Sequence, residues 1–275
     1  MDLSGLVRVS VADVRRGPDQ RSEQVTQAIM GTAVSVSGHR PRKWIRAHLP
    51  DGYKGYIHKG LLHLGDERLV RRWIRQADTL VTVPWTMIYS RRSPHSDPVS
   101  DVVMGTKLCR IDESTRWIRV RLPDDRQGWL ARHETTRGIH LIHPEGGTSR
   151  DILRLARRFL GVPYLWGGLT PKGFDCSGFT QTVFGLNGYP LPRDAYQQFR
   201  CGRKIRSRKD LAPADLLFFR APGAKRITHV AVHMGQERFL HCSDLVKINS
   251  IDPSAPDYDV SLDQNYVGAA RIVGG

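Results

Sequence analysis

The feature that most constrains the fold is an internal repeat in the first half of the chain. "SEQVTQAIMG" (22–31) aligns with "SDPVSDVVMG" (96–105), and "KWIRAHLPDGYKGYIH" (43–58) aligns with "RWIRVRLPDDRQGWLA" (116–131). Both copies consist of short runs of alternating apolar and polar residues separated by Gly, Pro and Asp, a pattern typical of small β-barrels. A recurring pattern of this kind indicates one structural unit that occurs twice.

Each copy also has the same order of a tryptophan, a polar turn and a Gly-aromatic-aliphatic run. This order resembles bacterial SH3-like domains. The resemblance implies two small SH3-like β-barrels, which we expect at residues 1–65 and 78–142. The remaining residues, 148–275, follow a Gly-Gly linker and have a different pattern.

The repeat alignment distinguishes two tyrosines of the first copy. Tyr56 falls opposite Trp129, so we expect it to be a core aromatic. Tyr53 falls opposite Arg126, in a turn where packing does not require an aromatic side chain. Tyr53 is therefore a candidate functional residue, because loops carry binding residues more often than packed strands do.

Composition argues against nucleic acid and against membrane insertion. The net charge is +15, but residues 1–145 carry +8 and residues 146–275 carry +7, so there is no basic tail. The densest basic run, "RKIRSRK" (203–209), has no aromatic residue for base stacking. The chain contains no run of 18 apolar residues. We expect a solvated basic surface and a monomer.

The N-terminus lacks the charged start and apolar core of a secretory signal. This favours a cytoplasmic location, although removal of a signal would allow an exported protein. The four cysteines are irregularly spaced and form no CxxC motif, so we expect reduced thiols, with neither a metal site nor a disulfide framework.

One cysteine stands out in the second half, in "GFDCSGFT" (173–180). From Cys176 onward, Phe179, Val183 and Leu186 recur at helical spacing, so Cys176 is expected to open a helix. The unpaired backbone N–H groups at a helix start favour a thiolate, so we expect the pKa of this thiol to be lowered. The alternative is a structural thiol.

A nucleophilic thiol needs a base, and "ITHVAVHMGQERFLHCS" (227–243) offers histidines in a strand-turn-strand pattern. With a loop at 234–236, His229 would lie directly opposite His241, where one imidazole can orient the other. His229 is then the base and His241 the orienting group. Surface histidines or metal ligands are the alternatives.

Two neighbouring residues on this predicted hairpin are expected to have no catalytic role. His233 shares the strand face of His229 but lies nearer the turn, so it is taken as a bystander. Cys242 alternates to the face opposite His241 and is expected to be a core thiol.

The segments "PYLWGG", "GFDCSGFTQ", "LPRDAYQQ", "ITHVAVHMG" and "FLHCS" together closely resemble NlpC-type cysteine peptidases, a papain-like α+β family that acts on bacterial cell-wall peptides. With two SH3-like domains ahead, the chain looks like the γ-D-glutamyl-L-diamino-acid endopeptidases. The implied substrate is a murein peptide, L-Ala-γ-D-Glu-diamino acid, with a free N-terminal L-alanine. The implied chemistry uses no metal and no organic cofactor.

The resemblance also implies roles for individual residues. Cys176 is the nucleophile, His229 the base and His241 the third member. The residues expected to bind substrate are Tyr164 and Trp166 along the groove, Asp175 and Ser177 at the substrate's amino end, Arg193 and Asp194 closing the site, and Glu23 and Tyr53 walling it off from the first barrel. Close relatives often have serine after the Arg-Asp pair, but this chain has Ala195.

Two other functions are compatible with the same segments. One is a cell-wall-binding protein in which the SH3-like domains do the work and the second half is vestigial. The other is amidase or acyltransferase chemistry on the same fold.

Overall fold

The computed structural model describes residues 4–37, 43–137 and 146–274. The chain divides into two compact units, Met1–His140 and Leu141–Gly275. None of the helices in the described residues is both long and apolar enough to span a bilayer.

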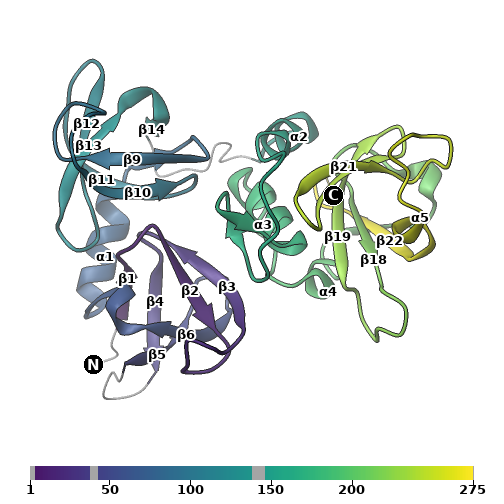
Figure 1. Ribbon diagram of the computed structural model, residues 1–275, viewed down its shortest axis with the longest axis horizontal. Helices are drawn as coiled ribbons and strands as arrows, with labels where there is room; N and C mark the ends of the chain where they lie inside the picture. The colour runs from purple at the N-terminus through teal and green to yellow at the C-terminus, as the bar shows by residue number, and fades with distance from the viewer. Residues whose placement is uncertain (1–3, 38–42, 138–145, 275) are drawn as a thin grey trace. The chain divides into compact units, whose positions relative to one another are not determined.

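The first repeat forms one antiparallel sheet of seven short strands (Figure 1). These are β1 Ser4–Val7, β2 Val11–Arg15, β3 Gln24–Ile29, β4 Ala33–Ser37, β5 Trp44–His48, β6 Lys54–His58 and β7 Leu62–Gly65, with a 3-10 turn at Lys59–Leu61. Their spatial order is β3-β2-β6-β5-β4-β1-β7. Alternate residues such as Val14, Ile45 and Ile57 are fully buried and form its core, which explains the period of two in the sequence.

The second repeat forms a sheet of the same design. Its strands are β8 Thr79–Val81, β9 Trp85–Tyr89, β10 Pro98–Val103, β11 Lys107–Glu113, β12 Trp117–Arg121, β13 Gln127–Ala131 and β14 Thr135–Arg137, with a 3-10 turn at Arg132–Glu134. The order, β10-β9-β13-β12-β11-β8-β14, is that of the first sheet shifted by seven strands. The predicted repeat is therefore a structural repeat.

The prediction of two SH3-like units is confirmed, and each set of strands pairs into one sheet that, in the described part of the chain, is not closed by hydrogen bonds. In the described residues, no ladder joins the edge strands β3 and β7, or β10 and β14. The shortest ladders are at the same place in both sheets, where β2 meets β6 through the single pair Arg15↔Tyr56 and β9 meets β13 through Trp129↔Tyr89.

Helix α1 (Glu67–Gln76) connects the two sheets and is capped by Asp66, whose side chain accepts from the Leu69 N–H. Trp73 of this helix is buried in a cluster that includes Met30 of the first repeat and Ile118 of the second. A shared apolar core explains why both sheets and α1 belong to one unit.

Both tyrosine predictions for the first repeat need correction. Tyr53 is half-buried and packs against the core of the first sheet, so packing does use its ring. Tyr56, expected in the core, is only half-buried on β6. The equivalent Arg126 serves a different purpose, because its Nη2 donates to the Arg8 carbonyl at 3.1 Å and so ties the second sheet to the first.

The second unit has an antiparallel sheet of six strands in the order β17-β22-β18-β19-β20-β21. Its strands are β17 Arg203–Ile205, β18 Leu216–Phe219, β19 His229–Gly235, β20 Arg238–Cys242, β21 Val246–Ser250 and β22 Tyr266–Arg271. A small hairpin, β15 Leu169–Thr170 and β16 Gly173–Phe174, precedes them.

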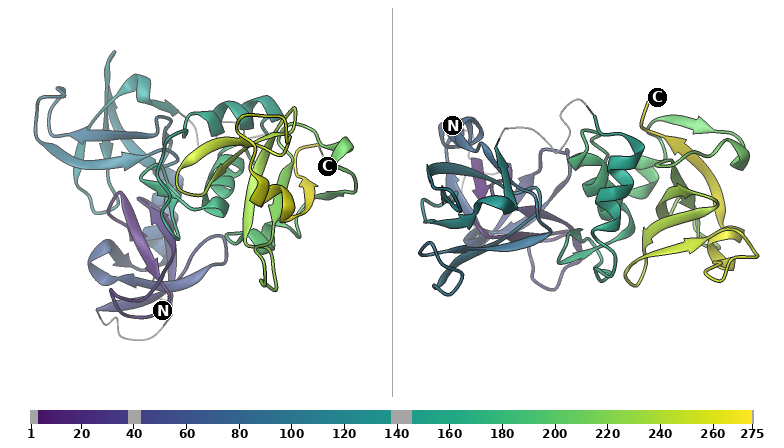
Figure 2. Two further views of the ribbon diagram at one scale, coloured as in Figure 1. Left: turned by 45° about the vertical axis from the view of Figure 1, so that its right-hand side comes forward. Right: turned by 90° about the horizontal axis from the view of Figure 1, so that it is seen from above.

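The helices of this unit are α2 Ser149–Arg157, α3 Cys176–Leu186, α4 Ala195–Gln198 and α5 Val260–Gln264, with a 3-10 turn at Arg208–Asp210. Helix α3 packs against β19 and β20 (Figures 1 and 2). This packing brings the first residue of α3 to the beginning of β19, where the candidate site lies.

Candidate active site

Cys176 is the first residue of α3, as the sequence predicts. The helix is capped by Asp175, whose Oδ1 accepts from the Gly178 N–H at 2.7 Å. Gly178 has no side chain because a Cβ there would collide with the Gly168 carbonyl. The cap and this close approach explain why an aspartate precedes the cysteine and a glycine follows it by two residues.

The Asp175 carboxylate is also paired with Arg193, from the loop before α4. Arg193 Nη1 donates to Asp175 Oδ1 at 2.9 Å and Nη2 donates to Oδ2 at 2.5 Å. Arg193 Nη1 also donates to Ser177 Oγ at 2.9 Å, and Arg193 itself is 2% exposed. The structure therefore brings together three predicted site residues as one buried, charge-compensated network.

The thiol of Cys176 is buried, and its Sγ lies 3.9 Å from the Thr228 carbonyl oxygen. Burial, followed by the negative charge of Asp175, raises the pKa of Cys176 to about 12. The expectation of a lowered pKa was wrong because the loss of water around the sulfur outweighs the partial positive charge of the helix start. A raised pKa favours the neutral thiol at neutral pH.

The hairpin that carries the two histidines has a register different from the one predicted. Strand β19 runs to Gly235, and the turn is Gln236–Glu237, both with positive φ. The backbone pairs Val232↔Leu240 and His233↔Phe239 place His229 diagonally from His241 and not directly opposite it. The error comes from the turn, which was predicted one residue too early.

The two imidazoles nevertheless meet, because diagonal neighbours share a strand face and aromatic side chains can span that distance. His229 Nε2 lies 2.9 Å from His241 Nδ1. His241 Nε2 in turn lies 3.0 Å from Asn249 Oδ1. The side chains of β19, β20 and β21 thus form a continuous hydrogen-bonded relay.

Burial dominates the ionisation of both histidines. It lowers the pKa of His229 to about 3, with smaller contributions from the charges of His241 and Lys247. It also lowers the pKa of His241, while the hydrogen bond that His241 donates to Asn249 acts in the opposite direction. At neutral pH both rings are neutral, so each has one nitrogen that donates and one that accepts.

The two residues expected to be bystanders have structural contacts. His233 is buried, and its Nδ1 lies 3.0 Å from the Ala212 carbonyl oxygen, away from the relay. Cys242 is fully buried, with its Sγ 3.2 Å from the Phe174 carbonyl oxygen.

The other predicted residues of this unit are Tyr164, Trp166 and Asp194, and Tyr164 interacts electrostatically with Cys176. The backbone N–H of Tyr164 donates to the Asp244 carbonyl at 2.8 Å, and burial raises the pKa of its phenol, as does the neighbouring Cys176. Trp166 is 61% exposed. Asp194 caps the short helix α4, whose first residue is the buried Ala195.

The remaining predicted residues, Glu23 and Tyr53, lie in the first unit. Glu23 Oε2 is 2.8 Å from Arg16 Nη2. The backbone N–H of Tyr53 donates to Asp51 Oδ1 at 3.0 Å, within the turn before β6. Their assignment to the substrate site remains a proposal.

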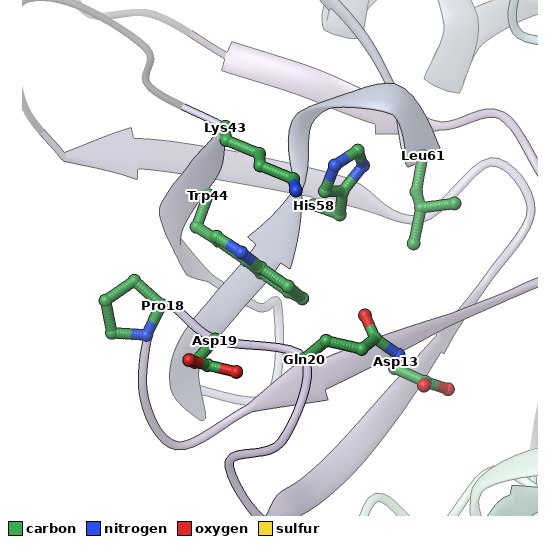
Figure 3. A pocket seen from close by; sticks show the side chains of 8 residues that line it. All are labelled: Asp13, Pro18, Asp19, Gln20, Lys43, Trp44, His58 and Leu61. Atoms are coloured by element: carbon green, nitrogen blue, oxygen red, sulfur yellow. The ribbon is translucent and has the colours of Figure 1, made fainter.

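The first sheet also has a pocket of about 510 Å³ beside the edge-to-face pair Trp44 and His58 (Figure 3). Among the described residues that line it, none is a predicted site residue: they are Asp13, Pro18, Asp19, Gln20, Lys43, Trp44, His58 and Leu61.

Sequence reasoning missed Asn249. Lys247 and Asn249 are two positions apart on the strand after His241, so both lie on the same face of that strand. That spacing could have indicated a side chain within reach of His241, but no sequence motif marks Asn249. No cluster of three or more His, Cys, Asp or Glu side chains suited to a metal ion occurs in the described parts of the chain.

Comparison with known proteins identifies both halves. Residues 161–262 match the NlpC/P60 family and residues 10–63 match the bacterial SH3 domain. The second unit contains an NlpC/P60 domain. The prediction of an NlpC-type domain preceded by SH3-like domains is confirmed.

Several known proteins are similar to this chain over most of its length. The chain is 28% identical to the gamma-D-glutamyl-L-lysine dipeptidyl-peptidase of Bacillus cereus, over 90% of this chain and 75% of the relative. It is 26% identical to dipeptidyl-peptidase 6 of Lysinibacillus sphaericus, over 94% and 96%. The crystal structure of an NlpC/P60 family protein from Bacillus cereus matches with a TM-score of 0.81 and 25% identity, over 98% of this chain and 99% of that one.

Proposed function

We propose that the protein is a cysteine peptidase that hydrolyses the bond between D-glutamate, through its γ-carboxyl, and an L-diamino acid in cell-wall peptides. The observation that carries the proposal is the 2.9 Å contact of His229 with His241, in an NlpC/P60 domain whose α3 begins at Cys176. The names of the relatives from Bacillus cereus and Lysinibacillus sphaericus support a peptidase of this type.

The proposed reaction begins with a neutral pair. His229 Nε2 is hydrogen-bonded to His241, so Nδ1 is the nitrogen of His229 that remains to accept the thiol proton. As that proton moves to Nδ1, the sulfur of Cys176 attacks the γ-glutamyl carbonyl, and backbone N–H groups at the start of α3 stabilise the oxyanion.

Breakdown of the intermediate returns the proton. His229 gives it to the departing amine of the diamino acid, and a thioester remains on Cys176. His229 then takes a proton from water, and the hydroxide attacks the thioester. The carbon–sulfur bond breaks, the L-alanyl-D-glutamate part leaves as a carboxylic acid, and the proton on His229 returns to the Cys176 sulfur. No step in this sequence uses a metal or an organic cofactor.

Recognition of a free N-terminal L-alanine requires a carboxylate near its ammonium. We assign this to Asp175 and Glu23, with Ser177 beside them, and assign Tyr53 to the wall that shortens the amino side of the groove. Tyr164 and Trp166 are assigned to the sides of the groove, and Arg193 and Asp194 to its closure. With Ala195 at the next position, no side-chain hydrogen bond to substrate arises there.

The diamino acid is proposed to be L-lysine or diaminopimelate, and the relative's name favours lysine. The test is mass spectrometry of the products from L-Ala-γ-D-Glu-L-Lys and from its diaminopimelate counterpart, with a Cys176→Ala control. Cleavage after D-glutamate that depends on Cys176 supports the proposal. Hydrolysis of an amide bond other than the one after D-glutamate, or formation of an acyl-transfer product, would favour the amidase or acyltransferase alternative. Binding without turnover would favour the wall-binding alternative.

The monomeric state and the cytoplasmic location are further proposals. Size-exclusion chromatography with light scattering tests the first, and fractionation of the producing cells tests the second.

A further inference from the structure

Asn249 closes the hydrogen-bonded relay at the end distant from Cys176. It lies on β21 opposite Phe239, so it is the diagonal neighbour of His241, just as His229 is on the other side. The three side chains therefore cross β19, β20 and β21 in one diagonal line on one face of the sheet.

The orientation of the Asn249 amide is fixed by its surroundings. Its Nδ2 donates to the Asp257 backbone carbonyl at 3.0 Å, and that carbonyl also accepts from the Ser250 N–H at 2.9 Å. If the amide were turned around, two oxygens would face each other at the Asp257 carbonyl and Nδ2 would face His241. The contact with Asp257 therefore presents Oδ1, an obligate acceptor, to His241.

This acceptor determines where every proton in the relay lies. His241 Nε2 must carry a hydrogen to donate to Asn249 Oδ1. A neutral His241 then has a bare Nδ1, which accepts from His229, so His229 must carry its hydrogen on Nε2. The Nδ1 atom of His229 is left without a proton, and it is the atom that the proposed mechanism uses as the base.

We propose that Asn249 is a positioning residue that fixes the tautomers of His241 and His229 and so keeps His229 Nδ1 available as the base. This proposal rests on the proposed peptidase function for its kinetic test, but its tautomer test does not depend on activity. The side chain of Asn249 contacts His241 and the Asp257 carbonyl, so Asn249 acts through His241.

The charged groups around His241 define the pH dependence. The charged side chains are Lys247 on β21, Asp244 in the turn after β20 and Asp259 at the start of α5, and the titratable neutral neighbour is His229 on β19. Protonation of His241 would place a hydrogen on Nδ1, facing His229 Nε2. His229 would then have to accept there and carry its own hydrogen on Nδ1, which removes the base.

Two variants separate the role of Asn249 Oδ1, which accepts from His241, from the role of Nδ2, which donates to the Asp257 carbonyl. Asn249→Leu and Asn249→Asp both remove the donor to the Asp257 carbonyl, so they weaken that anchor alike. Only Asn249→Asp keeps an acceptor for His241 Nε2. Ser250→Ala is the matched control, because it removes a hydrogen bond of the same strand, from Ser250 Oγ to the Glu237 carbonyl, without touching the relay.

We expect Asn249→Leu to lower kcat by ~10–100-fold with little change in KM, the range for loss of a group that orients a ligand or base. Asn249→Asp should retain activity near wild type at alkaline pH. Its added negative charge favours protonated His241, so the acid side of its pH–kcat profile should move to higher pH. Ser250→Ala should resemble wild type in both.

The deciding readout is long-range ¹H–¹⁵N NMR of histidine in the free protein, which reports which ring nitrogen carries hydrogen. We expect Nε2–H on both His229 and His241 in wild type and Asn249→Asp, and loss of that preference in Asn249→Leu. Nδ1–H on His241 in wild type, or equal kcat and equal tautomers in the Leu and Asp variants, would overturn the proposal. If the peptides are not cleaved at all, the peptidase function fails while the NMR result still decides the role of Asn249.

Discussion

The guanidinium of Arg193 holds both oxygens of Asp175, at 2.9 and 2.5 Å, in the interior of the second unit. Asp175 is at the same time the cap of α3 and the residue before Cys176. The negative charge beside the nucleophile is therefore neutralised within the fold. This pair stabilises the start of α3, and its charge is not freely available to a substrate ammonium.

Arg193→Met is expected to destabilise the second unit strongly. Removing one partner of a buried ion pair leaves an uncompensated charge and costs ~3–5 kcal/mol. The measurement is the free energy of unfolding from urea titration. Arg154→Met is the control, because Arg154 pairs with Asp151 but is largely exposed, and its loss should cost ~0–1 kcal/mol. Equal effects of the two changes would contradict the structural role of the Asp175–Arg193 pair.

The relay predicts a graded series of catalytic losses. Cys176→Ala and His229→Ala should each lower kcat by ~10⁴-fold or more, because they remove the nucleophile and the base. His241→Ala should cost less, ~10²–10⁴-fold, because an orienting group transfers no proton to substrate. Turnover of the murein tripeptide measures each one.

The control for this series is His233→Asn. His233 lies on the same strand and is buried, and the asparagine Nδ2 can replace its Nδ1 contact with the Ala212 carbonyl. Activity within a few-fold of wild type is expected. A loss as large as that of His229→Ala would mean that the relay does not explain the chemistry.

The raised pKa of Cys176 predicts slow alkylation at neutral pH. Iodoacetamide is uncharged and reacts with the thiolate, and a pKa of about 12 keeps the thiolate scarce until strongly alkaline pH. The rate should therefore rise steadily from pH 7 to pH 10, followed as labelling of the Cys176 peptide by mass spectrometry. A plateau that is already reached in mildly acidic solution would instead indicate a resting thiolate–imidazolium pair.

The sequence was sufficient for features that have a local cause. The strand pattern of the two repeats follows from alternating burial, and the start of α3 at Cys176 follows from its cap and its helical apolar spacing. The prediction that His229 and His241 share one face of the sheet was correct. Side chains alternate between the two faces, so a register error of two residues leaves each side chain on the same face.

Features set by tertiary context were not predictable in this way. The hairpin turn has Gln236 and Glu237 at positive φ. Neither residue type is typical of turns with positive φ, so the position of the turn and the strand register were predicted wrongly. The pKa of Cys176 depends on how deeply α3 is buried, which no local pattern encodes. Asn249 acquires its role only through the carbonyl of Asp257, eight residues further along the chain.

The paired state of Asp175 also changes the expectation for the free amino end of the substrate. Of the two carboxylates proposed to meet the ammonium, Asp175 is committed to a buried arginine, whereas Glu23 is paired with an Arg16 side chain that is 70% exposed. A surface ion pair contributes only ~0–1 kcal/mol, so exchanging Arg16 for an ammonium is inexpensive. Glu23 is therefore the carboxylate expected to discriminate.

Wild type should cleave L-Ala-γ-D-Glu-L-Lys better than its N-acetyl form by ~10–100-fold in kcat/KM, the equivalent of ~1.5–3 kcal/mol for a hydrogen bond to a charged group. Glu23→Gln should reduce this preference by raising KM for the free amine while leaving the acetylated peptide unchanged. Arg16→Gln, which removes the Arg16 ion pair of Glu23, should leave the preference intact or enlarge it. If Glu23→Gln slows cleavage of both peptides equally, the glutamate supports the fold of the first sheet and does not recognise the amino end. If wild type cleaves both peptides equally, the proposed requirement for a free alanine is wrong.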